Sequence, residues 1–237
     1  MAAYGQKLPG RLRTLCAIAA LLLIAAPVSA DNEAAPPRYE RSLPEAEVLI
    51  DVGHGGVDGG AVYDGIMEKD INLAIAKRLY LMLGRYGIRA VMNRSGDYAL
   101  SDDNRWHLTQ SRHRKDLSQR RHLADEIPVQ LFVSLHVNWS SNGSAHGPLL
   151  LHQNEGRSAL LAAFIQNSLN REQGLIRSPR LGKPYYLLRR VQTPAVIVET
   201  GFLSNPRDRN ALIDPREQQR VATAIADAIR YYKLIAE

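Results

Sequence analysis

Two histidines and two glutamates carry the chemistry that this sequence offers: His54, Glu68, His136 and Glu199. His54, His136 and Glu199 each follow a short apolar run that is typical of a buried strand. In open α/β sheets, ligands bind outside the carboxyl ends of the strands, where these three side chains would meet. Two histidines and a glutamate with one open coordination position form a known catalytic zinc pattern, and a further glutamate supplies the general base. The four residues together therefore predict a metal site.

The segment that carries the first histidine, Asp51–Gly60, holds five glycines. Because glycine tolerates positive φ and has no Cβ, such a turn can place His54 at the open mouth of the sheet. Ordinary explanations also exist. A single histidine after a strand is more often a hydrogen-bonding loop residue, and Glu68 before a helix could be a solvated charge near the helix dipole. The convergence of three strand ends favours the metal site.

Four blocks of sequence, in this order, resemble the zinc-dependent N-acetylmuramoyl-L-alanine amidases, which cut the stem peptide from muramic acid in peptidoglycan. The blocks are IDVGHGGVDGGA, EKDINLAIAKRL, SLHVN and PAVIVETGFLSNPRD. The resemblance covers roughly residues 47–234. It implies that His54, Glu68 and His136 bind one zinc ion and that Glu199 is the catalytic glutamate. Val52 stands where the family usually has proline, which should alter turn stiffness rather than chemistry.

Two further residues are predicted to contact the substrate. An arginine at the position of Arg120 lies near the active site in the family, although an exposed helical arginine would explain it equally well. Asn138 could orient a ligand or the substrate, although it also suits the turn that follows. The polar segment Ser95–Ser118 is either a solvated loop or a groove wall for anionic glycan strands. Its SRHRKDL stretch resembles the sporulation branch of the family, which prepares cortex muramic-δ-lactam.

Residues 1–30 look like an export signal, with a basic start, an apolar run and a small-residue cleavage site before Asp31. The apolar run is short for a membrane span, and an uncleaved anchor is the alternative. Cys16, the only cysteine, lies in this part, so the mature chain has no thiol chemistry or disulfides. The proline-containing residues 31–44 are predicted to be a linker, and residues 45–237 the zinc amidase catalytic domain. The protein is expected in the cell envelope or outside the cell.

The charge of the chain is too small to indicate nucleic acid as a partner. The formal net charge is +6, and removal of the three basic residues of the export signal lowers it to +3. The expected partners are peptidoglycan and an activating or localising cell-envelope protein. Contact with a membrane is expected only through the N-terminal segment.

The order of elements predicts one α/β domain with a mainly parallel twisted sheet, helices on both faces and zinc at the carboxyl ends of the strands. Asp70 is the expected N-cap of the first long helix, and Ser158 that of a later helix that buries Leu160. The remaining predicted elements are helices over 117–126, 206–212 and 217–234 and strands over 89–92, 147–151, 185–188 and 195–199.

The predicted reaction is hydrolysis of the amide between the lactyl group of N-acetylmuramic acid and L-alanine. A zinc peptidase or a carbohydrate deacetylase with the same metal set is one alternative, and a non-catalytic cell-wall-binding domain is another. Some division amidases carry an extra helix that plugs the zinc. The span 138–198 leaves little room for such a plug, and we expect an open site.

Overall fold

The computed structural model describes residues 45–102 and 110–236, and every structural statement below refers to these residues. The predicted export signal and linker, residues 1–44, lie outside them. Within the described ranges, no helix combines the length and the apolar character that a membrane crossing requires.

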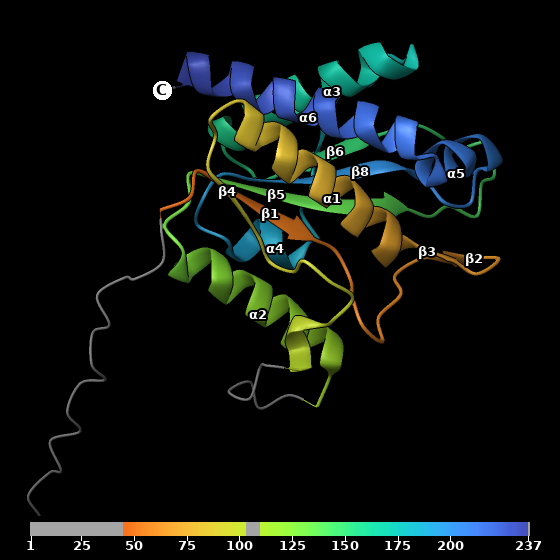
Figure 1. Ribbon diagram of the computed structural model, residues 1–237, viewed down its shortest axis with the longest axis horizontal. Helices are drawn as coiled ribbons and strands as arrows, with labels where there is room; N and C mark the ends of the chain where they lie inside the picture. The colour runs from red at the N-terminus through yellow and green to blue at the C-terminus, as the bar shows by residue number, and fades with distance from the viewer. Residues whose placement is uncertain (1–44, 103–109, 237) are drawn as a thin grey trace, which may run out of the picture. The chain divides into compact units, whose positions relative to one another are not determined.

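A six-stranded sheet with the strand order β4-β1-β5-β8-β6-β7 forms the centre of the domain (Figure 1). The strands β4, β1, β5 and β8 are parallel to one another, β6 is antiparallel to β8, and β7 is parallel to β6. The predicted mainly parallel sheet is therefore confirmed. The bounds are β1 Val48–Val52, β4 Ala90–Met92, β5 Leu131–Asn138, β6 Leu149–His152, β7 Arg180–Leu181 and β8 Ala195–Phe202.

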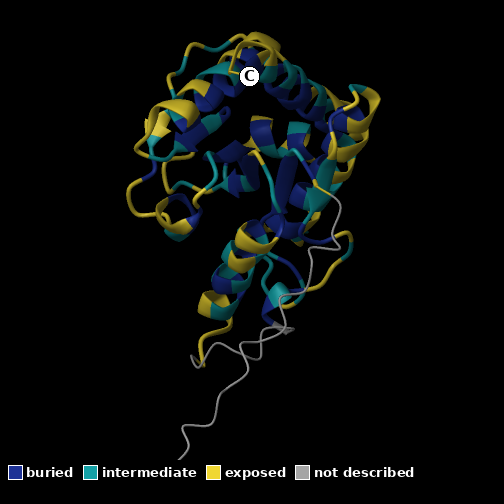
Figure 2. Ribbon diagram, turned by 90° about the vertical axis from the view of Figure 1, so that its left-hand side faces the viewer, coloured by how far each residue is buried: buried dark blue, intermediate teal, exposed yellow. Residues whose placement is uncertain are grey.

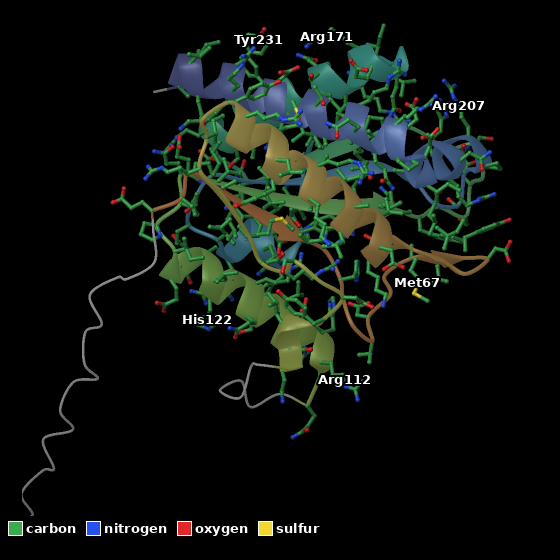
Figure 3. All side chains as sticks on the ribbon, viewed as in Figure 1. Met67, Arg112, His122, Arg171, Arg207 and Tyr231 are labelled. Atoms are coloured by element: carbon green, nitrogen blue, oxygen red, sulfur yellow. The ribbon has the colours of Figure 1, made fainter. Side chains whose placement is uncertain are left out.

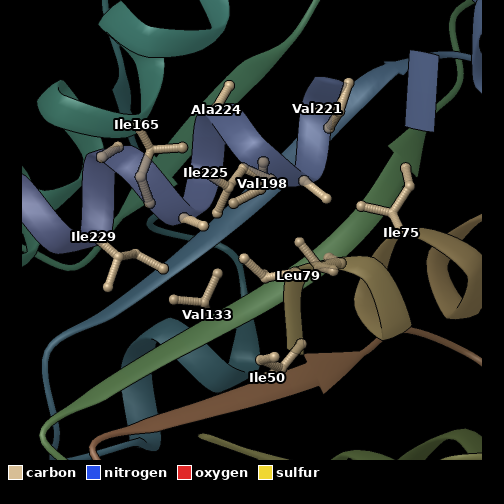
Figure 4. Packing of buried hydrophobic residues seen from close by; sticks show 14 of the residues in the cluster. Ile50, Ile75, Leu79, Val133, Ile165, Val198, Val221, Ala224, Ile225 and Ile229 are labelled. Carbon is tan, nitrogen blue, oxygen red and sulfur yellow. The ribbon is translucent and has the colours of Figure 1, made fainter. Parts of the chain in front are cut away.

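One face of the sheet is covered by three long helices, α1 (Glu68–Arg85), α3 (Gly156–Gln173) and α6 (Pro215–Ala236), as Figure 1 shows. Figure 4 shows side chains of α1, α3 and α6 meeting those of β1, β5 and β8 in this layer. The predicted apolar face of the last helix is buried throughout. Its members are Val221, Ala224, Ile225, Ala228, Ile229 and Tyr232.

The opposite face carries the helices α2 (Arg112–Glu126) and α4 (Tyr186–Arg190), which enclose a second apolar cluster. The short 3-10 helix η1 (Leu100–Asp102) lies against α2. In Figure 2 the buried residues concentrate in the strands and on the inward sides of the helices. Helices therefore cover both faces of the sheet, as predicted.

Two small elements extend the domain at the carboxyl ends of the strands. A separate two-stranded hairpin joins β2 (Val62–Tyr63) to β3 (Ile66–Met67), directly before α1. The helix α5 (Pro206–Ile213) follows β8 and begins where it was predicted to begin. Figure 1 shows the hairpin and α5 at the same end of the sheet.

The predicted starts of two helices are wrong. The helix α1 begins at Glu68 after Met67, without a side-chain cap, and Asp70 lies in its first turn. The helix α3 is capped by Glu155, whose carboxylate accepts hydrogen bonds from two backbone N–H groups. Because α3 begins three residues earlier than predicted, Ser158 lies inside it, and Leu160 is 41% exposed.

Two segments differ from the predicted element type. Residues 185–188 do not form a strand, because Tyr186–Arg190 is the helix α4. A short apolar run fits a buried helix as well as a strand, and the pattern alone cannot separate them. The helix α2 begins at Arg112, five residues before the predicted start, because Ser111 caps it. The basic end of the polar segment is thus helical, and Figure 3 shows Arg112 at its start.

Candidate active site

The three predicted metal ligands lie together at the carboxyl ends of the strands. His54 follows β1, Glu68 opens α1, and His136 lies near the end of β5. Each offers one ligand atom, and these atoms all lie within 4.8 Å of one another. Glu68 Oε1 lies 3.3 Å from His54 Nε2 and 2.8 Å from His136 Nδ1. Within residues 45–102 and 110–236, no other group of three histidines, cysteines or carboxylates has this geometry.

Glycines make this close approach sterically possible. A Cβ added at Gly53 would collide with the imidazole of His136, and one added at Gly60 would lie 2.5 Å from Glu68 Oε2. Gly60 also has a φ of +66°, and His54 itself has a φ of 63°. A non-glycine residue in the left-handed region is uncommon and often marks a functional position. The backbone here is folded so that the three side chains face one another.

Glu68 is held by hydrogen bonds at both carboxylate oxygens. Oε1 accepts the N–H of Val137 at 2.9 Å, and Oε2 accepts the N–H of Ala61 at 2.8 Å. Burial raises the pKa of Glu68, but hydrogen bonds and charges from His136 and His54 outweigh it and hold the pKa well below its usual range. The carboxylate is therefore ionised, which is the form that binds a cation.

Asp58 orients His54 from the side away from Glu68. Its Oδ2 lies 2.9 Å from His54 Nδ1, and donation of the Nδ1 proton to this oxygen leaves Nε2 facing Glu68. Burial lowers the pKa of His54, but hydrogen bonds to Asp58 and Glu68 raise it to about 9. The hydrogen bond from His54 lowers the pKa of Asp58 to about 2.

Sequence reasoning missed the role of Asp58, although a signal was present. A carboxylate four residues after a candidate ligand, inside the same glycine-rich turn, fits the partner that a metal-binding histidine requires to fix its ring.

Arg120 lies beneath His136 and is 4% exposed, so the interpretation as an exposed helical arginine is wrong. Its Nε donates to Asp51 Oδ1 at 2.7 Å, and its Nη2 lies 3.3 Å from His136 Nε2. Burial lowers the pKa of Arg120, but the charge of Asp51 outweighs it and raises the pKa above the usual range. Asp51, at the end of β1, was not predicted as a site residue. The pair braces the back of His136, whose own pKa is lowered mainly by burial.

Glu199 stands beside the three ligands on the neighbouring strand. It pairs with His136 in the register of β5 and β8 and is 7% exposed. Burial and, to a lesser degree, the negative charge of Glu68 raise the pKa of Glu199 to about 8. A carboxylate that binds a proton this readily is suited to general base catalysis near neutral pH.

Two cavities meet at His54, His136 and Glu199. One has a volume of about 490 Å³ and is also lined by Val62 and by Asn138, Trp139 and their neighbours. The other, of about 380 Å³, is bounded by α2 and by residues 184–187 before and in α4, and Arg120 belongs to its wall. No helix within the described ranges fills either cavity, and the open site stays a prediction.

Asn138 and the first turn of α2 border these cavities. The Oδ1 of Asn138 accepts the N–H of Trp139 at 2.7 Å, so the residue shapes the local turn and also lines the larger cavity. Arg112 and His113 line a further cavity of about 350 Å³ together with Asp58. The basic end of the polar segment therefore lies next to the site, and its contact with glycan stays a prediction.

Comparison with known proteins assigns the chain to a family. The family model described as N-acetylmuramoyl-L-alanine amidase matches residues 48–231, which contain all four predicted catalytic and metal residues. The chain belongs to the N-acetylmuramoyl-L-alanine amidase family. The amidase reaction is hydrolysis of the amide that joins N-acetylmuramic acid of peptidoglycan to L-alanine of the stem peptide. This membership argues against the peptidase, the deacetylase and the non-catalytic binding domain.

Similar amidases agree with the predicted fold and branch. A germination-specific N-acetylmuramoyl-L-alanine amidase of Bacillus subtilis is 31% identical over 187 residues, which are 78% of each chain. The CwlD amidase of Clostridioides difficile, solved in complex with the GerS lipoprotein, superposes with a TM-score of 0.75. It is 28% identical, and the match covers 81% of this chain and all of that one.

A second solved amidase shows the same architecture. The catalytic domain of CwlV from Bacillus (Paenibacillus) polymyxa var. colistinus has a TM-score of 0.67 and 31% identity. The match covers 80% of this chain and 99% of that domain. The predicted single α/β catalytic fold is confirmed by these similarities.

Proposed function

We propose that this amidase works with one zinc ion held by His54, Glu68 and His136. The observation that carries the proposal is the convergence of two imidazole nitrogens and one ionised carboxylate within 4.8 Å. Two nitrogens and one oxygen are a donor set that zinc accepts, and three protein ligands leave one position open. Bound there, zinc would act as a Lewis acid on the lactyl carbonyl and would activate a water molecule.

Glu199 is proposed as the general base. Its carboxylate accepts a proton from the attacking water and returns that proton to the alanine nitrogen as the C–N bond breaks. The products are the lactyl carboxylate on muramic acid and a stem peptide with a free amino group. Without a cation the pKa of Glu199 is about 8, and a positive charge at the three ligands would favour its ionised form at neutral pH.

Two residues are proposed to act on the substrate from the cavity walls. Asn138 lines the larger cavity beside Glu199, where its amide could meet the polar groups of a muramoyl peptide. Arg120 lines the smaller cavity, but its guanidinium donates to Asp51. Its effect on the substrate would therefore act largely through the position of His136.

We further propose that the enzyme is exported and acts in spore cortex maturation. The basic and apolar residues 1–30 support a cleaved signal peptide, with an uncleaved anchor as the alternative. Similarity to a germination-specific amidase and to CwlD supports a role in the spore cortex. The CwlD structure contains a lipoprotein, which supports an envelope protein as the partner that activates or localises this enzyme.

The proposed roles at the metal are tested by comparing a variant of the proposed base, Glu199, with variants of the proposed ligands His136 and Glu68. Glu199→Gln is nearly isosteric, so it should keep zinc and stability while activity falls by about 10²- to 10⁴-fold. His136→Ala and Glu68→Ala should lose zinc, activity and thermal stability together, because bound metal stabilises the folded state. The measurements are metal analysis, thermal melting and mass spectrometry of muropeptide products.

Two results would contradict the assignment. A Glu199→Gln protein without zinc would show that this residue is a ligand, and one with near-normal turnover would exclude it as the base. Cleavage products other than an intact stem peptide and lactyl-bearing muramic acid would exclude amidase action.

A further inference from the structure

An exposed pair of aromatic rings lies at the rim of the larger cavity. Trp139, directly after β5, is 49% exposed, and Tyr63 of the β2–β3 hairpin is 40% exposed. Their ring centroids are 6.3 Å apart, with an angle of 37° between the planes. Trp139 lines the same cavity as His136 and Glu199. The pair is therefore continuous with the site at which the amide is cut.

The backbone around the indole is fixed by hydrogen bonds. The N–H of Trp139 donates to Asn138 Oδ1 at 2.7 Å, and the next N–H, of Ser140, donates to Ser204 Oγ at 3.1 Å. The carbonyl of Asn138 accepts the N–H of Leu203 at 2.9 Å. An exposed indole on a backbone held in this way loses little conformational freedom when a ligand packs on it.

The tyrosine ring is held by a cation from a third element. The guanidinium carbon of Arg209, in α5, lies 3.7 Å from the centroid of the Tyr63 ring. Arg209 Nη1 also donates to the carbonyl of Leu203 at 2.9 Å, which anchors the guanidinium. Figure 1 shows the hairpin and α5 at the carboxyl ends of the strands, where these residues meet. Rigid, half-exposed aromatic residues beside an arginine are typical of binding hot spots.

We propose that Trp139 and Tyr63 form a sugar-stacking subsite for the glycan strand of peptidoglycan. The inference rests on the proposed amidase function, because that function places a muramic acid residue in the adjoining cavity. The C–H groups on the face of a pyranose ring are apolar and pack flat against an aromatic ring, while the hydroxyl groups at its edge stay in water. The sugar next to the muramic acid would then lie on these rings.

Kinetics on two substrates test the subsite. Trp139→Ala and Tyr63→Ala should raise KM for uncross-linked polymeric glycan strands by about 3- to 10-fold, the effect of one lost aromatic contact. The value of kcat and the zinc content should stay near those of the wild type. KM for a muramoyl peptide with a single sugar should change far less, since that substrate has no neighbouring sugar. Trp139→Phe keeps an aromatic ring and should bring KM for the polymeric strands most of the way back to the wild-type value.

Tyr80→Ala is the matched control. Tyr80 is an aromatic residue of α1 with a similar exposed fraction, 44%, and it lines a different cavity near β4. Its replacement should leave both KM values unchanged. A rise of KM for the polymeric strands as large as that of Trp139→Ala would point to a general surface effect and overturn the subsite.

A binding measurement separates the subsite from catalysis. The chain has two tryptophans, so a Trp106→Phe, Glu199→Gln protein reports on Trp139 by fluorescence. Peptide-free glycan strands should change this fluorescence on titration, and free stem peptide should not. A response to the peptide alone, or an equal rise of KM for both substrates, would overturn the inference. If the wild type cleaves neither substrate, the proposed function fails instead, so the two failures are distinguishable.

Discussion

At the scale of single residues, the site holds two groups whose pKa values are raised for different reasons. The pKa of Glu199 is raised to about 8 by burial and by the charge of Glu68, which outweigh the opposing charge of His54. The pKa of His54 is raised to about 9, because hydrogen bonds to Asp58 and Glu68 outweigh the effect of burial. The first group becomes neutral and the second becomes charged. A site that shifts its groups in this way has an excess of negative charge, which a divalent cation would compensate.

The raised pKa of Glu199 predicts how the stability of the metal-free protein depends on pH. In the unfolded chain the glutamate titrates near 4.5, so its stabilising protonation is fully present below that pH and is lost as the pH rises through about 8. Between these values, the free energy of unfolding should fall by at most about 1.4 kcal/mol per pH unit. Glu199→Gln should lack this component. Urea unfolding of chelator-treated wild type and variant at pH 5.5, 7 and 8 measures it, and parallel pH profiles would contradict it.

At the scale of elements, the site depends on the turn between β1 and the hairpin more than on any strand. The strand β1 ends at Val52, whose N–H donates to Asn93 Oδ1 at 2.8 Å. A proline at this position would have no N–H to donate, so the valine gains one buried hydrogen bond. The turn then places His54 and, through the N–H of Ala61, one oxygen of Glu68. Glycine at 60 is required both by its φ and by its contact with Glu68.

Two alanine substitutions separate these requirements. Gly60→Ala would place a Cβ 2.5 Å from Glu68 Oε2, whereas Gly65, in the hairpin, has a φ of +75° and nothing within 4 Å of the added Cβ. Both variants should lose roughly 1 kcal/mol of stability through backbone strain. Only Gly60→Ala should also weaken zinc binding, by about tenfold or more, because it displaces the proposed ligand Glu68. Zinc titration and urea unfolding measure the two effects, and equal zinc affinities in the two variants would contradict the steric explanation.

At the scale of the whole molecule, the two faces of the sheet serve packing, and the candidate site lies at the carboxyl ends of its strands. The helices α1, α3 and α6 bury the larger apolar cluster on one face, and α2 and α4 bury a smaller one on the other. The carboxyl ends of β1, β5 and β8 carry the proposed ligands His54 and His136 and the proposed base Glu199. Substrate polymers must reach this edge from outside the domain.

Delivery by the N-terminal segment is tested on the whole chain. If the signal is cleaved between Ala30 and Asp31, the protein recovered outside the cytoplasm should begin at Asp31 and lack three basic residues. Amino-terminal sequencing and intact mass measure this. Full-length chain in the membrane fraction would instead support the uncleaved anchor.

The features that could be predicted are those that a short contiguous stretch of sequence encodes. His54, His136 and Glu199 could be singled out as candidates because each follows an apolar run that forms part of β1, β5 or β8. The starts of two helices were predicted wrongly. Glu155 caps α3 in place of Ser158, and α1 begins after Met67 without a side-chain cap. Residues 185–188 were assigned wrongly because a short apolar run has no period of its own.

The amino-acid sequence was enough to identify the candidate reacting groups, since two histidines, two glutamates and the glycines between them lie in contiguous motifs with recognisable spacing. The contacts that support these groups and border the site became visible only in the folded domain. Arg120 meets Asp51 across 69 residues, and Trp139 meets Tyr63 from a different element. Such pairs leave no local pattern, because the crossover connections of a parallel sheet, and not neighbouring residues, bring their side chains together.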